Sequence, residues 1–311
     1  MKGIAHFVTG VAVASCLPAV VAAGATHNPL YFVLGGVFGL LPDTLDFKFY
    51  RFFYRHDMDI VPDPNAPDPQ MIADGLALAV NEAHRRKRPV RAKLHTVRLG
   101  ADLWQQYVVR FDVANRRVCV RLGPAVSTSR TPIGTAPAKA TEGRAALDCA
   151  PAVDYEATVT IDILDGPTFT MQPQTDGRVL ASFIPWHRAW SHSLVLAAAF
   201  AAAGWLLIDA VAATVIFASF AAHALLDQAG YLGSALWFPI SRRRVPGLQR
   251  LHSADALPNF AVVWTCCLLV FWNLHRGLAH APFRLPLLGL LFFGALLPLS
   301  GLALLRRALR E

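Results

Sequence analysis

Charged residues are scarce in this chain and unevenly placed. Asp, Glu, Lys and Arg make up only 16% of its 311 residues, whereas an ordinary soluble domain contains about a quarter. None of these four residue types occurs from Gly3 to Pro42. This lack of charge excludes a protein that is soluble throughout. It predicts apolar blocks at both ends of the chain, separated by a polar middle from about Arg55 to Pro185.

Cysteine is also scarce, and its spacing excludes a cysteine-ligated metal site. Cys16, Cys266 and Cys267 lie in apolar blocks, where cysteine usually behaves as a small buried hydrophobic residue. Cys119 and Cys149 lie in the polar middle and are the only pair that could form a disulfide there. We expect them to be reduced, because a cytoplasmic domain rarely keeps disulfides.

The apolar blocks predict six membrane-spanning helices. They are expected at roughly 5–25 and 30–42, as two helices within Ser193–Leu226, and at about 258–274 and 285–305. The expected fold class is mostly α: a six-span transmembrane helical bundle with an inserted small α+β soluble domain built on an antiparallel sheet. A cleaved signal peptide is the alternative for the first apolar block. Against it, only Lys2 precedes the block, and the apolar run resumes almost at once.

The placement of basic residues predicts how the chain is oriented. Those that flank span ends on one side are Lys2, Lys48, Arg51, Arg55, Arg188, Arg242, Arg243, Arg244, Arg250, Arg306, Arg307 and Arg310. The opposite loops offer only Arg276 and Arg284. The positive-inside rule therefore places both termini and the inserted domain in the cytoplasm, with the protein integral to the bacterial inner membrane. The net charge of +8 follows from this topology, so we expect membrane lipid as a partner and no nucleic acid.

The polar middle has the pattern of a separate domain. We assign 1–55 and 185–311 to the membrane unit and 56–184 to an inserted cytoplasmic, β-rich domain. Asp68–His84 has an amphipathic pattern typical of a helix, and runs such as Val159–Ile163 alternate with the period of two that indicates strands. The basic run Arg85–Arg88 could contact anionic lipid, although a solvated charge run is the simpler interpretation.

Histidine and aspartate collect at one predicted membrane face. His6 opens the first predicted span, Asp43 and Asp46 close the second, His187 and His192 open the third, and His223 and Asp227 close the fourth. Because successive spans alternate in direction, all of these side chains are expected on the cytoplasmic side. His223 and Asp227 are four residues apart and therefore share one helical face. Imidazole and carboxylate together are typical ligands of zinc and similar divalent metals.

The pattern thus predicts a site for one or two divalent metals, most simply zinc, with manganese as the alternative. The expected ligands are His6, Asp43, Asp46, His187, His192, His223 and Asp227. Asp46 and His192 are also the candidate catalytic residues, and Arg188 and His252 are candidates for substrate binding. Taken singly, a His at a span end can be an interfacial residue, and Asp255 near His252 can simply cap a helix.

These residues carry a resemblance to a known family. The early His6, Leu41-Pro42-Asp43-x-x-Asp46, His187-Arg-x-x-Ser-His192-Ser and His223-x-x-x-Asp227 resemble the YdjM-like (DUF457) family, described as membrane-bound metal-dependent hydrolases. The family usually has Gly and Thr where this chain has Ala189 and Ser191. It is distantly similar to zinc phospholipase C and the P1-type nucleases. The resemblance covers the membrane unit only.

Residues and resemblance together favour one function over two others. We expect a metal-dependent hydrolase of a phosphoester, with a lipid-like substrate whose anionic headgroup meets the cytoplasmic membrane face. A metal or ion transporter is the first alternative, but no predicted span carries a charge at its midplane, where ion pathways usually need one. A non-catalytic membrane scaffold that presents the inserted domain is the second.

Overall fold

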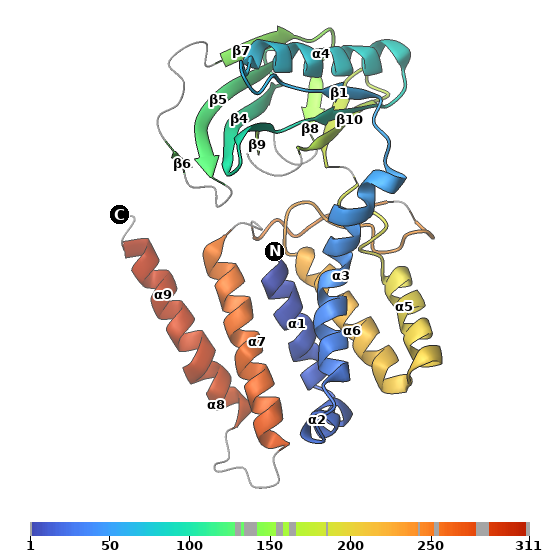
Figure 1. Ribbon diagram of the computed structural model, residues 1–311, viewed down its shortest axis with the longest axis vertical. Helices are drawn as coiled ribbons and strands as arrows, with labels where there is room; N and C mark the ends of the chain where they lie inside the picture. Colours follow the sequence, from blue (N-terminus) through green and yellow to red (C-terminus); the bar gives the residue numbers. More distant parts are fainter. Residues whose placement is uncertain are drawn as a thin grey trace. The chain divides into compact units, whose positions relative to one another are not determined.

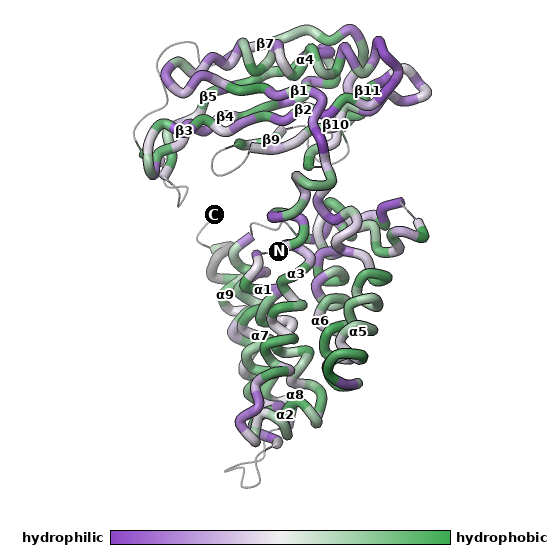
Figure 2. The backbone as a smooth tube through the Cα atoms, turned by 45° about the vertical axis from the view of Figure 1, so that its right-hand side comes forward, coloured by the Kyte–Doolittle hydropathy of each residue, from purple (hydrophilic) through white to green (hydrophobic). Residues whose placement is uncertain are grey.

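A computed structural model describes residues 2–127, 132–133, 142–153, 158–161, 166–184, 186–241, 243–251, 255–277 and 286–308. The chain divides into two compact units. The helical unit comprises Met1–Tyr50 and Trp186–Glu311, and the sheet unit comprises Arg51–Pro185. Figure 2 shows that apolar residues dominate the helices of the first unit, whereas polar and apolar residues alternate along the strands of the second.

The helical unit contains the apolar helices. They are α1 (Gly3–Ser15), α2 (Pro18–Ala25), α3 (Leu30–Phe53, which continues into the sheet unit), α5 (Leu194–Leu207), α6 (Ala210–Asp227), α7 (Ala256–Arg276), α8 (Leu287–Leu291), the π-helical turn η1 (Phe292–Leu296) and α9 (Leu297–Ala308). Figure 1 shows α1 beside α7, and α8–α9 beyond α7. The Trp264 indole on α7 donates a hydrogen bond of 2.6 Å to the Gly294 carbonyl of η1, which ties the last helix to the others.

The expected six-span bundle is wrong. Within the described residues, four helices are long and apolar enough to cross a membrane: Leu30–Tyr50, Ala210–Asp227, Ala256–Arg276 and Leu287–Leu304. The first predicted span is instead α1 and α2, which meet at an angle of 93°. Pro18 causes this break, because proline suits the first turn of a new helix and cannot continue the old one. The third predicted span, α5, has only 14 residues, fewer than the roughly 20 that a straight crossing needs.

The helix that holds Asp43 is longer than its sequence suggested. α3 continues through Pro42 to Phe53, whereas we expected a helix that ends near residue 42. Proline is tolerated inside membrane helices when neighbouring groups satisfy the carbonyls that it leaves free. As a result, Asp43 and Asp46 lie within a helix, where a spacing of three residues puts them on nearly the same face.

α1 runs parallel to α7 along a seam of regularly spaced polar contacts. Three residue pairs, all with the same offset in sequence, make them: Lys2 with Asn259 (N to Oδ1, 2.8 Å), Thr9 with Cys266 (Oγ1 to Sγ, 3.6 Å) and Cys16 with Asn273 (Sγ to Nδ2, 3.6 Å). The contacts recur every seven residues, which is two helical turns and the period of parallel helices packed along a common seam. This seam holds α1 in a fixed register, and α1 carries His6.

Glycines bring α1 and α3 unusually close. A Cβ atom added to Gly10 would lie 2.0 Å from the Gly35 carbonyl oxygen, and one added to Gly39 would lie 2.6 Å from the His6 carbonyl oxygen. Gly35 and Gly39 are four residues apart on one face of α3, the spacing at which small residues let membrane helices touch backbone to backbone. The contact places the start of α1 beside the segment of α3 that precedes Asp43.

The described residues of the sheet unit form two sheets and one long helix. Its elements are β1 (Met58–Ile60), α4 (Pro69–Arg86), β2 (Val90–Leu94), β3 (Val97–Gly100), β4 (Leu103–Asp112), β5 (Arg117–Ser127), β6 (Pro132–Ile133), β7 (Glu142–Ala146), β8 (Pro151–Val153), β9 (Thr158–Ile161), β10 (Thr168–Pro173) and β11 (Val179–Phe183). One sheet has the order β1-β2-β10-β11-β8. In the other, β3-β4-β5-β6 form the main path, β7 pairs with β5, and β9 pairs with β4.

The prediction of a small antiparallel sheet domain is also wrong. The described residues form sheets of five and six strands, and the pairs β1–β2 and β8–β11 are parallel. Alternating hydrophobicity reveals a strand but not its partner, and β1 and β8 have only three residues each. The expected helix is present as α4, whose buried Ile72, Leu76 and Val80 pack on strands of both sheets.

Candidate metal centre

The last turns of α6 present His223 and Asp227 to the interior of the helical unit. Both lie on the buried face of this helix, which also carries Ser219, Phe220 and Ala224. A spacing of four residues turns the two side chains toward one point. Ionisable groups on the buried face of an apolar helix are costly, which favours a functional role over a structural one.

His192 reaches the same point from the segment that precedes α5. Ser193 caps α5, because its Oγ accepts hydrogen bonds from the Val195 and Leu196 amides at 3.1 and 3.3 Å. The same hydroxyl donates to the Phe238 carbonyl at 2.5 Å. His192, which directly precedes this cap, is thus held in place, and its imidazole is fully buried.

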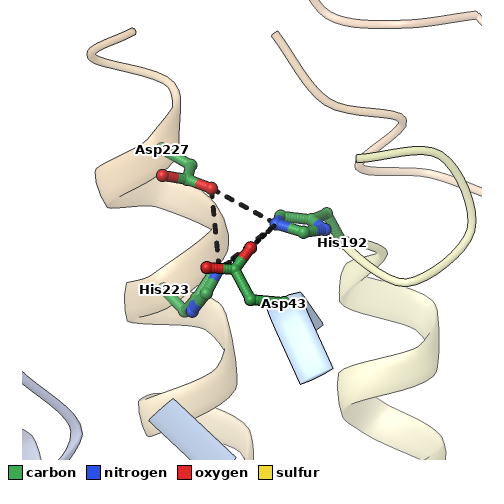
Figure 3. A group of neighbouring side chains, drawn as sticks. All are labelled: Asp43, His192, His223 and Asp227. Carbon is green, nitrogen blue, oxygen red and sulfur yellow. Dashed lines mark hydrogen bonds and ion pairs between the residues drawn. The ribbon is translucent and has the colours of Figure 1, made fainter. Parts of the chain in front are cut away.

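Four side chains from three segments meet in one cluster, which we call the His₂Asp₂ cluster: Asp43, His192, His223 and Asp227. Each offers one ligand atom, and these atoms all lie within 4.8 Å of one another. Figure 3 shows Asp43 from α3, His223 and Asp227 from α6, and His192 from the segment before α5, all converging on a common centre. No other group of three or more potential ligands is found among the described residues.

Hydrogen bonds behind the two imidazoles fix which nitrogen faces the centre. The His223 Nδ1 lies 2.6 Å from the Gly39 carbonyl oxygen, which can only accept, so Nδ1 carries the proton. The Ser191 hydroxyl donates to Asp46 at 2.5 Å and therefore accepts from His192 Nδ1 at 2.9 Å. In the neutral imidazoles, both Nε2 atoms therefore direct lone pairs into the cluster, where they lie 3.2 Å apart.

Such an arrangement calls for a cation. Two facing lone pairs repel each other, two carboxylates add negative charge, and Asp43 Oδ1 has no hydrogen-bond partner among the described residues. In tetrahedral zinc sites with bonds of about 2.0–2.1 Å, ligand atoms lie about 3.3–3.4 Å from one another. The corresponding distances here are 3.2 Å from His192 Nε2 to Asp227 Oδ2, 3.5 Å from His223 Nε2 to Asp227 Oδ2, and 3.6 Å from each Nε2 to Asp43 Oδ1. The four donors could therefore hold a metal ion.

His6 touches the cluster without joining it. Its ring stacks on His223 with a centroid distance of 3.7 Å and an interplanar angle of 22°. Its Nε2 lies 3.2 Å from Asp227 Oδ1, the oxygen opposite the one that faces the centre. His6 thus lies at the edge of the cluster, beside two of its four members.

Two further predicted ligands, Asp46 and His187, lie behind His192. The Asp46 carboxylate accepts from His187 Nδ1 at 2.9 Å and faces the Nδ1 side of His192 at 3.4 Å. Burial lowers the pKa of the His187 imidazole, and the hydrogen bond to Asp46 opposes this effect. The structure therefore brings four of the seven predicted ligands together and separates His6, Asp46 and His187 from the common centre.

The two predicted substrate-binding residues have different outcomes. Arg188 is buried, and its guanidinium engages Asp227 through Nε (3.0 Å to Oδ2) and Nη1 (3.1 Å to the carbonyl oxygen). It therefore contacts the cluster from inside, and its role in substrate binding stays a prediction. His252 lies outside the described residues.

Sequence reasoning missed two groups that support the cluster. Ser191 links His192 to Asp46, and the Gly39 carbonyl sets the tautomer of His223. Ser191 was visible as part of the His187–Ser193 segment, but no property of a single hydroxyl assigns it a role. The role of the Gly39 carbonyl has no signal in the sequence, because every residue has a backbone carbonyl. The only hint is that residue 39 is a glycine, which lets α1 approach α3 at this point.

The chain matches no protein-family model, curated protein or solved structure. The likeness to the YdjM-like family therefore rests on the motifs alone. What the site geometry carries by itself is a buried His₂Asp₂ cluster able to hold a metal ion, in a chain with four helices long and apolar enough to cross a membrane.

Proposed function

We propose that this chain is a membrane-bound, metal-dependent hydrolase whose His₂Asp₂ cluster holds one divalent ion, most simply zinc. The observation that carries the proposal is the pair of Nε2 atoms 3.2 Å apart, each held from behind, facing two carboxylates. Among divalent metals, zinc favours a tetrahedral set of imidazole and carboxylate ligands.

Each residue of the cluster then has a definite task. His192, His223 and Asp227 are almost fully buried and form the fixed part of the site. The Asp43 side chain is 16% exposed, so it forms the side that water and substrate can reach. When bound, a divalent metal supplies Lewis-acid chemistry, which activates water and stabilises negative charge on a phosphoryl oxygen.

The proposed substrate is a phosphoester, lipid-like and anionic, at the cytoplasmic membrane face. Support comes from the position of the ligands at the ends of apolar helices, because His223 and Asp227 occupy the last turns of α6. The segment that follows α6 exposes Arg243 and Arg250, which can attract an anionic headgroup. Fusing reporters after Arg55 and Glu311 tests the orientation, and a periplasmic signal from either one contradicts it.

A metal-stabilised scaffold is the second candidate, and one observation favours it. Four protein ligands complete a tetrahedral zinc site, whereas catalytic zinc usually has three and keeps one position open. Catalysis here would require that Asp43 dissociates from the metal or that the metal accepts a fifth ligand. The two candidates share the same metal site and differ only in turnover.

One experiment separates them. Protein purified in detergent is analysed for bound metal and then assayed with zinc or manganese against phospholipids, soluble phosphodiesters and carboxylic esters. Wild type is compared with His223→Ala and with His27→Asn, a control that alters an exposed His outside the cluster. For a hydrolase we expect metal-dependent turnover in wild type and His27→Asn, and loss by orders of magnitude in His223→Ala.

The other outcomes are equally informative. If the protein binds metal stoichiometrically but hydrolyses no substrate of the panel, the hydrolase proposal is contradicted and the scaffold proposal is supported. Absence of bound metal from folded wild type, even after zinc is added, contradicts both.

A further inference from the structure

Asp46 is the most heavily hydrogen-bonded carboxylate beside the cluster. Its three donors lie in the short segment 187–192: His187 Nδ1 at 2.9 Å, the Arg188 amide at 2.8 Å and the Ser191 hydroxyl at 2.5 Å. His192 Nδ1 lies 3.4 Å from the same carboxylate. An ionised carboxylate has about four lone-pair sites. Both oxygens of Asp46 are thus already engaged by the protein itself, Oδ2 by His187 and Arg188 and Oδ1 by Ser191.

We infer that Asp46 is a positioning residue, not a metal ligand: it holds His192 so that Nε2 faces the metal. This inference rests on the proposed metal site. A carboxylate that accepts the remote N–H of a metal-binding imidazole fixes the tautomer and the ring orientation and makes the ligand more basic. Asp46 does so through the Ser191 hydroxyl, which accepts from His192 Nδ1 and donates to Asp46, and the carboxylate itself lies 3.4 Å from that nitrogen.

The same carboxylate also stabilises an unfavourable backbone conformation. Arg188 has φ of 58°, a left-handed conformation that non-glycine residues seldom adopt. Its amide donates to Asp46, its carbonyl accepts from the Ala235 amide at 2.9 Å, and its side chain reaches Asp227. Asp46 therefore supports two of the four ligands, His192 through Ser191 and Asp227 through Arg188.

A proton relay through His192, Asp46 and His187 is the competing interpretation of this chain of contacts. It requires a proton to leave His192 Nδ1 while Nε2 is bound to metal, which would create an imidazolate. Asp46 also accepts a hydrogen bond from the Arg188 amide. This contact contributes nothing to a proton relay, but it does contribute to positioning. The geometry thus favours an orienting role.

Asp43 and Asp46 offer a matched pair for the test, because they are three residues apart on one helix. Zinc affinity of the detergent-purified full chain is measured by competition with a chromophoric chelator. Ligand number is measured from the visible absorption spectrum of the cobalt(II)-substituted protein. For Asp46→Asn we expect an unchanged four-coordinate cobalt spectrum with affinity reduced about 10- to 100-fold, the usual effect of losing an outer carboxylate partner. Asp43→Asn should alter the spectrum itself.

Ser191→Ala is the second variant, because it removes a single hydroxyl and leaves both carboxylates. It should weaken zinc binding in the same direction as Asp46→Asn, again without a change in the cobalt spectrum. If Asp46→Asn fails to fold, this variant decides the question.

Several results would overturn the inference. A cobalt spectrum of Asp46→Asn that changes as it does in Asp43→Asn would make Asp46 a ligand. Affinities within about twofold of wild type for both Asp46→Asn and Ser191→Ala would remove the positioning role while the metal site stands. A wild-type chain that binds neither zinc nor cobalt would overturn the proposed function together with this inference.

Discussion

Replacing His223 by alanine perturbs the centre of the site at a single residue. The change removes one of four ligand atoms, and it leaves the Gly39 carbonyl without the imidazole N–H that it accepts at 2.6 Å. It also removes the ring on which His6 stacks. We therefore expect His223→Ala to weaken metal binding strongly while the sheet unit remains folded.

The size of the effect follows from the number of ligands. Structural zinc sites bind with about 10–16 kcal/mol at neutral pH, so one ligand of four contributes roughly 3 kcal/mol. A loss of about 2.8 kcal/mol raises Kd about 100-fold. At free zinc 1,000-fold above the wild-type Kd, bound metal stabilises the native state by about 4.1 kcal/mol, and the variant would retain only about 1.4 kcal/mol by the same relation.

The assay measures Kd in buffered zinc and, in parallel, how denaturation of the helical unit shifts with free zinc. His27→Asn is the control, because His27 is exposed and has φ of 61°, which asparagine tolerates. A variant that binds zinc within about threefold of wild type would refute the assignment of His223 as a ligand. So would an equal weakening in His27→Asn, since the effect would then not be specific to the cluster.

Three further predictions concern the packing of both units. Gly39→Ala should destabilise the helical unit by about 1–3 kcal/mol, because the new Cβ would lie 2.6 Å from a backbone oxygen. The control Gly301→Ala fills open space on α9 and should be neutral. Equal thermal stability of the two variants would contradict the close approach of α1 and α3. Leu76→Ala empties a fully buried position on α4 and should cost about 2–5 kcal/mol, seen as faster proteolysis of the sheet unit, while Leu78→Ala changes an exposed side chain and should not. Burial raises the pKa of the Cys149 thiol, so less thiolate is present at a given pH. Alkylation by iodoacetamide at pH 8 should therefore be much slower in the native protein than in denaturant. Equal rates would show that the thiol is accessible.

The composition of the cluster could be predicted from the sequence because simple rules govern its parts. His223 and Asp227 share a helical face by their spacing, and apolar runs indicate which residues lie in helices. The two residues do meet Asp43 and His192 in the structure. The residue types were sufficient to suggest a divalent metal.

The division of labour within the cluster could not be predicted. Asp43 and Asp46 differ only by one helical turn, and which of them faces the centre depends on the path of the segment 187–192. That path depends in turn on Arg188, whose positive φ has no signature in sequence. The parallel pairs β1–β2 and β8–β11 were missed for a similar reason, because strand pairing depends on neighbours that are distant in the chain. The break at Pro18 was missed although its cause is local.

The ion pair between Arg188 and Asp227 has a consequence for the kind of ion that the site accepts. In and beside the cluster lie three carboxylates, Asp43, Asp46 and Asp227, and the Arg188 guanidinium, so with neutral imidazoles these groups carry a net charge of −2. In the proposed metal site a divalent cation would make these groups electrically neutral, whereas a monovalent or a trivalent ion would leave one unit of charge in a largely buried cluster, which is unfavourable. Without the metal, protons must take its place, so loading releases protons and is coupled to folding. For the proposed site, the balance of charge thus favours a divalent ion, and the ligand types then favour one element among the divalent metals.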